Sequence, residues 1–137
     1  MKFRILSKCF LLLVVIGFFM PVSCNMNGFD IGNAFIGNNS SGIGLDMFIG
    51  IAVYLIFFAA IASMIISVIY ILAKKKNPPL TADWILLLVS IGSGLIAFFK
   101  SIDEVSLEYG AYFILAGWIL SLLCLIISSL KSRAKSK

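Results

Sequence analysis

The sequence contains few charged residues and no histidine. Only 12% of its 137 residues are charged and 61% are hydrophobic, whereas soluble globular domains have about 25% charged residues. So few charges do not cover the surface of a water-soluble domain, which argues against a soluble enzyme, a nucleic-acid-binding module and a disordered tail. The missing histidines also remove the commonest general base and the commonest metal ligand. We therefore expect a small integral membrane protein without enzymatic activity, cofactor or metal site.

Three long uncharged runs predict transmembrane helices. They cover residues 47–73, 84–99 and 109–130, and a bilayer core needs about 20 helical residues, with a range of about 17–25. The middle run is short and is expected to recruit residues 80–82 or 101–102. Helices are expected because an isolated strand in lipid leaves its backbone polar groups unpaired. The prediction is an all-α fold, a small helical transmembrane bundle formed by residues 47–137 with a basic tail.

The first 24 residues have two interpretations. A basic start precedes an apolar stretch over residues 10–20 and then Pro21-Val22-Ser23-Cys24, which is the layout of a secretory signal peptide. The end of this segment resembles the lipobox of bacterial lipoproteins, in which a small residue precedes a lipidated cysteine, although Pro21 departs from that pattern. The resemblance implies removal of residues 1–23, lipidation of Cys24 and three spans. Alternatively, residues 1–23 are not cleaved and form a first transmembrane helix, so that the bundle has four spans.

Two connecting segments carry turn-forming residues. Residues 24–46 are rich in glycine and asparagine, which favours turns and a mobile exported linker; a partner-binding or pore-covering loop is the alternative. Asn77-Pro78-Pro79 lies between the first two long runs and predicts a tight helical hairpin. Thr81 or Asp83 is expected to cap the helix that follows.

Basic residues indicate the orientation in the membrane. If the N-terminus is cytoplasmic and each apolar run crosses once, every lysine and arginine except Lys100 lies on one side, as the positive-inside rule requires. We therefore predict a multi-pass protein of a bacterial cytoplasmic membrane, with 24–46 and 100–108 outside and 74–83 and 131–137 in the cytoplasm. The residues expected to set this topology and to contact anionic lipid headgroups are Lys74, Lys75, Lys76, Lys131, Arg133, Lys135 and Lys137.

Small residues spaced by four form stripes on the long runs. Such stripes let helices approach closely in lipid, so we expect them to pack the bundle, or alternatively to join subunits. No charged residue interrupts the runs, which argues against an ion-coupled transporter. The predicted helix-packing residues are Ala59, Ser63, Ser67, Ser90, Gly94, Gly117 and Ser121.

These patterns favour a structural function over a chemical one. The leading hypothesis is a non-enzymatic membrane protein that scaffolds or accompanies a larger membrane assembly. Its expected partners are the lipid bilayer and either a second copy or another membrane protein, and no nucleic acid. The alternative is a homo-oligomeric channel or holin-like pore built on the small-residue stripes.

Overall fold

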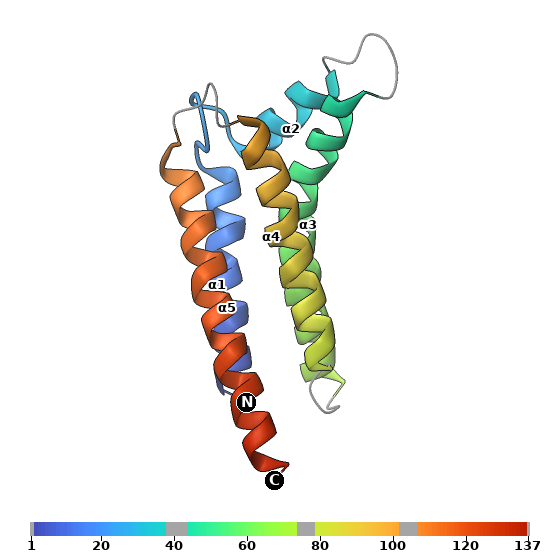
Figure 1. The fold of residues 1–137 in the computed structure, drawn as a ribbon, viewed down its shortest axis with the longest axis vertical. Coiled ribbons are helices and arrows are strands. Elements are labelled where there is room, and N and C mark those ends of the chain that lie inside the picture. Colours follow the sequence, from blue (N-terminus) through green and yellow to red (C-terminus); the bar gives the residue numbers. More distant parts are fainter. Residues whose placement is uncertain (1, 38–43, 74–78, 102–106, 137) are drawn as a thin grey trace.

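The computed structural model describes residues 2–37, 44–73, 79–101 and 107–136. Within these residues the regular elements are helices, and Figure 1 shows four long helices side by side with a short one across one end. The predicted all-α fold is confirmed. The helices are α1 (Lys2–Phe19), α2 (Gly28–Gly37), α3 (Leu45–Leu72), α4 (Leu80–Ser101) and α5 (Tyr109–Lys135).

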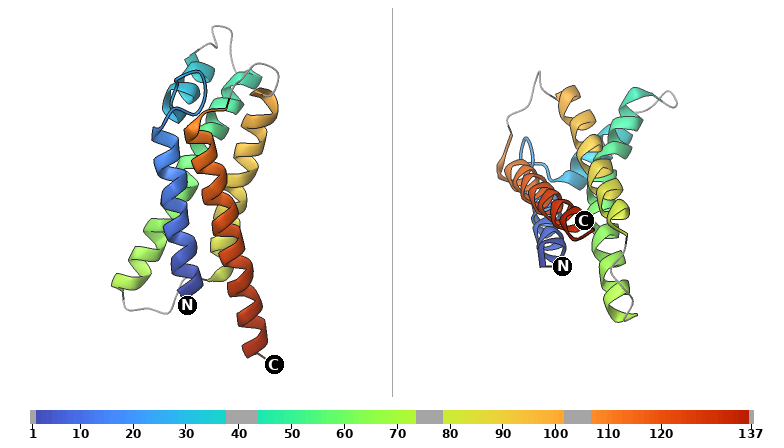
Figure 2. Two further views of the ribbon diagram at one scale, coloured as in Figure 1. Left: turned by 90° about the vertical axis from the view of Figure 1, so that its left-hand side faces the viewer. Right: turned by 60° about the horizontal axis from the view of Figure 1, so that its bottom comes forward.

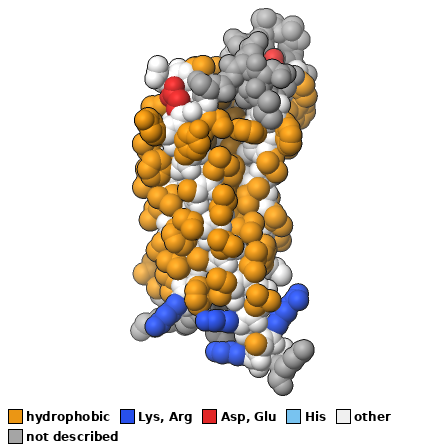
Figure 3. Space-filling view, turned by 60° about the vertical axis from the view of Figure 1, so that its left-hand side comes forward, with side chains coloured by type: hydrophobic (Ala, Val, Ile, Leu, Met, Phe, Trp, Pro, Cys, Tyr) orange, Lys and Arg blue, Asp and Glu red, His pale blue; other side chains and the backbone are white. Residues whose placement is uncertain are grey.

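Three of these helices, α3, α4 and α5, are long and apolar enough to cross a membrane, which is consistent with a small multi-pass membrane protein. The start of α1 and the end of α5 lie at the same end of the bundle (Figure 1). Lysine and arginine side chains gather at this end, and acidic side chains are seen at the other (Figure 3). We call these the basic end and the acidic end. The distribution matches the charge asymmetry of membrane proteins.

The four long helices are arranged as two pairs. α1 packs along α5 and α3 packs along α4, whereas α4 and α5 touch only sparingly although they are consecutive in the sequence. Figure 2 shows α1 and α5 side by side in two further views. Their close approach depends on Gly17 and Gly110, because a Cβ on either one would lie 2.7 or 2.6 Å from the carbonyl oxygen of the other.

The core lies where the two pairs meet, and α1 contributes to it fully. Val14 and Phe18 of α1 are 0% and 1% exposed. Phe18 stacks on Phe57 of α3 with ring centroids 5.0 Å apart, and it meets Phe29 of α2 edge-on at 4.9 Å. Aromatic contacts of this geometry add to the energy of burial. One face of the N-terminal helix is therefore part of the core of this structure.

The helix α2 corrects the prediction of a turn-rich linker, which is wrong for residues 28–37. Asn27 caps the helix: its Oδ1 accepts a 2.9 Å hydrogen bond from the Asp30 backbone N–H, and Asp30 Oδ2 accepts one from the Asn27 N–H at 3.4 Å. This reciprocal arrangement is a capping box. The helix packs against α3, where Tyr54 donates a 2.6 Å hydrogen bond to Asn33 Oδ1. Residues 38–43 of the predicted linker lie outside the described residues.

The start of α4 also differs from the prediction. The helix begins at Leu80, directly after Pro79, so Thr81 and Asp83 lie inside its first turn and neither is the capping residue. A proline at the start of a helix costs no intrahelical hydrogen bond, because the first backbone N–H groups have no partner within the helix. The short apolar run is extended at both ends, from residue 84 back to Leu80 and from residue 99 on to Ser101. Asn77 and Pro78 lie outside the described residues.

Candidate functional site: a buried ion cluster at the basic end

A cluster of three charged side chains lies near the basic end of the bundle, in which Asp83 is buried and Arg4 and Lys8 are half-buried. Asp83 of α4 is 3% exposed. Its Oδ2 accepts hydrogen bonds from Arg4 Nη2 at 2.6 Å and Arg4 Nε at 3.0 Å, and its Oδ1 accepts one from Lys8 Nζ at 2.5 Å. Lys8 also donates to the hydroxyl of Ser63 on α3. The cluster thus joins α1, α3 and α4.

Local sequence explains why these groups can meet. Arg4 and Lys8 are four residues apart in α1 and therefore project from the same face of the helix. Asp83 lies in the first turn of α4, where the helix dipole favours a negative charge. Both carboxylate oxygens accept hydrogen bonds from basic side chains of α1, so Asp83 links α4 to α1.

The cluster is expensive to disrupt. The side chains of Arg4, Lys8 and Asp83 are only 17%, 13% and 2% exposed. A buried ion pair gives little net stability compared with apolar residues of the same shape, but removal of one partner costs about 3–5 kcal/mol because a buried charge loses its counter-charge. The cluster therefore makes the position of α4 depend on the presence of α1.

Buried serines form further polar contacts between helices. Ser7 of α1 donates a 3.2 Å hydrogen bond to the Ser121 carbonyl, and the two hydroxyl oxygens are 2.7 Å apart. Ser90 of α4 donates to the Ile56 carbonyl at 3.2 Å and accepts from Trp118 Nε1 at 3.0 Å. Because these hydroxyls are satisfied within the protein, they stabilise the helix packing.

The predicted helix-packing residues lie mostly at contacts inside the chain. A Cβ on Gly117 would lie 2.8 Å from Val14 of α1, and one on Gly94 would collide with the Trp118 ring at 1.9 Å. Ala59 is buried, and Ser67 donates a 3.1 Å hydrogen bond back to the Ser63 carbonyl of its own helix. Ser63, Ser90 and Ser121 make the contacts described above. Most of the predicted residues thus make contacts within one chain.

The remaining predicted residues lie at the two ends of the bundle. Cys24 is exposed and follows α1, with φ at 51°. At the basic end, Lys131 lies 4.3 Å from the centre of the Phe3 ring, while Arg133 and Lys135 occupy the last turn of α5. The predicted headgroup contacts Lys74, Lys75, Lys76 and Lys137 lie outside the described residues.

Sequence reasoning placed Arg4, Lys8 and Asp83 at the same membrane surface but did not pair them. The spacing of the two cations and the presence of a single acid among the predicted cytoplasmic residues were the available signals. Within the described residues, no group of three or more acidic or cysteine side chains is placed to hold a metal ion. No protein-family model matches the sequence, and no match was found among curated proteins or solved structures.

Proposed function

We propose that this protein is a non-enzymatic membrane protein that scaffolds or accompanies a larger assembly, as a bundle of four long helices in which α1 is retained. The observation that carries the proposal is the ion cluster of Arg4, Lys8 and Asp83, because both oxygens of the buried carboxylate are used to hold helices together. The same contacts support the retention of α1. Its loss would leave Asp83 without either cation.

The outer surface supports a role in contacts with lipids and partner helices. Large apolar side chains are exposed on each of the three long apolar helices, for example Leu55 at 41%, Ile85 at 60% and Ile119 at 60%. In the orientation we propose, the basic end faces the cytoplasm of a bacterial-type cell, where Lys131, Arg133 and Lys135 contact anionic headgroups.

A photo-crosslinking experiment in intact cells tests the accessory role. A photoreactive amino acid is placed singly at Leu55, Ile85 and Ile119, which face outward from α3, α4 and α5. We expect a protein adduct of defined mass from one of these helices and only lipid adducts from the others, because a partner helix covers one face. Absence of a protein adduct at all three positions would contradict the accessory role.

A flux measurement separates this function from the alternative pore. Most of the predicted helix-packing residues make contacts within the chain, which favours packing of one bundle over the joining of subunits around a channel. We expect liposomes that contain the purified protein to retain a small encapsulated dye as well as protein-free liposomes do, with a pore-forming peptide as the positive control. Leakage that rises with the amount of protein would favour the pore.

A further inference from the structure

A cavity of about 220 Å³ lies between the two helix pairs on the acidic side of Trp118. All five helices contribute to its wall, and α2 closes the end. The wall is almost entirely apolar. Representative lining residues are Phe18 of α1, Ile31 of α2, Val53 of α3, Gly94 of α4, and Leu115 and Trp118 of α5.

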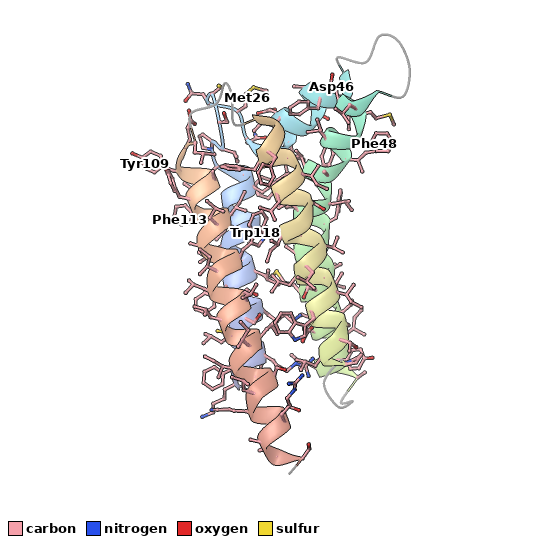
Figure 4. The ribbon with its side chains drawn as sticks, viewed as in Figure 1. Met26, Asp46, Phe48, Tyr109, Phe113 and Trp118 are labelled. Atoms are coloured by element: carbon pink, nitrogen blue, oxygen red, sulfur yellow. The ribbon has the colours of Figure 1, made fainter. Side chains whose placement is uncertain are left out.

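Trp118 forms the floor of this cavity. It extends from α5 towards α4 (Figure 4), where its ring lies against Gly94 and its indole N–H donates to Ser90. The indole thus bridges two helices that otherwise touch only sparingly. Since its N–H is already satisfied, Trp118 presents only apolar ring surface to the cavity.

The cavity opens sideways between α4 and α5. Leu95 and Phe98 of α4 and Leu115 of α5 line it and are also 49%, 39% and 38% exposed, which places them at its rim. These residues belong to helices long and apolar enough to cross a membrane. The opening therefore faces the hydrocarbon region of a bilayer.

Size and chemistry select the occupant. An apolar cavity of about 150 Å³ remains dry and takes up benzene, so this slightly larger one favours an apolar group over water. An α-helix with its side chains is about 10–12 Å wide, which is too large for the cavity, so a second copy or a partner helix does not fit. We propose that this cavity binds the acyl chain of a bilayer lipid, which enters between α4 and α5.

Fluorescence quenching by a brominated lipid tests the proposal. In a Trp84→Phe background, Trp118 is the only tryptophan, and it is 8% exposed. The protein is reconstituted in phosphatidylcholine vesicles with or without bromine on the acyl chains. We expect strong quenching of Trp118, because a bound chain contacts the ring that forms the cavity floor.

Two variants change the cavity in opposite directions. Ala111→Leu places a larger side chain in the cavity wall and should lower the quenching about twofold, because packed side chains leave little free volume. Leu115→Ala widens the opening of the cavity and should raise the quenching of Trp118. Ala116→Leu, the same substitution at an exposed position of α5, is the matched control and should leave it unchanged.

The outcomes decide the proposal in either direction. Opposite shifts in Ala111→Leu and Leu115→Ala, with no change in Ala116→Leu, would support acyl-chain binding in the cavity. The proposal would be overturned if Trp118 is not quenched, or if quenching is equal in all variants. If Ala111→Leu fails to fold, as judged by circular dichroism, the response of Leu115→Ala alone carries the test, because that variant only removes side-chain atoms at the rim.

Discussion

Asp83→Asn is expected to lower the free energy of unfolding by about 3–5 kcal/mol. The substitution preserves the shape of the side chain but removes its charge, so Arg4 and Lys8 remain in a poorly solvated site without a counter-charge. The loss is measurable by reversible denaturation in mixed detergent micelles, followed by circular dichroism.

Asp46→Asn is the matched control for this substitution. Asp46 also lies in the first turn of a long helix, α3, but it is exposed. Its removal should cost at most about 1 kcal/mol, through the helix dipole. Replacement of Arg4, Lys8 and Asp83 together by leucine should restore most of the stability, because no buried charge is then left unpaired. Equal losses in Asp83→Asn and Asp46→Asn would show that the cluster is not buried in the membrane-embedded protein.

Cysteines at Ser7 and Ser121 are expected to form a disulfide in nearly every molecule. The two hydroxyl oxygens are 2.7 Å apart and both residues are buried, at 1% and 0% exposed, so the side chains are in direct contact and a small adjustment brings two sulfur atoms to the bond length of about 2.0 Å. The double variant is made in a background in which Cys9, Cys24 and Cys124 are replaced. After oxidation in membranes, mass spectrometry of a digest should show the two peptides linked.

Ser7→Cys combined with Ser128→Cys is the control pair. Ser128 is seven residues beyond Ser121 in the same helix, so it lies about 10 Å further along the axis and beyond disulfide reach. Linkage of residue 7 to 128 but not to 121 would contradict the register of α1 on α5. Absence of any linkage to residue 7 would contradict the packing of α1 in the bundle.

The sequence predicted the long helices well because hydrophobic length is a local property. The run over residues 109–130 corresponds to α5, and the run over 47–73 corresponds to α3. The extent of α4 was harder to predict, because Asp83 interrupts the apolar pattern and its hydrogen-bond partners lie on the distant helix α1. A residue whose environment is set by a distant segment has no local signature.

The sequence interpretation missed the helix α2 and the ion cluster, for two different reasons. The helix α2 was hidden by its glycines, which have low helix propensity, although the Asn27 and Asp30 capping pair was a visible signal. The ion cluster joins residues 75 and 79 positions apart, and spacing rules along one helix do not reach so far. The small-residue stripes predicted close packing, but their partners, such as Val14 against Gly117, required the arrangement of α1 on α5.

The two interpretations of the N-terminus have different consequences for this structure. Removal of residues 1–23 would take away the buried side chains of Ser7, Val14 and Phe18 together with both cations of the cluster. The face of α5 that packs on α1 would then be exposed to lipid, with Gly110 and Gly117 uncovered. These contacts support our proposal of a bundle of four long helices, in which Cys24 would be an internal residue without an attached lipid.

Intact-mass analysis of the protein tests most directly whether residues 2–23 are retained and Cys24 carries no lipid. The protein is expressed in bacteria that carry the enzymes of lipoprotein processing and is extracted from their membranes. Our account predicts a mass that includes residues 2–23 and no acyl group, and the same mass for the Cys24→Ala variant apart from the substituted atoms. A mass that lacks residues 1–23, with an added acyl group at Cys24, would contradict it.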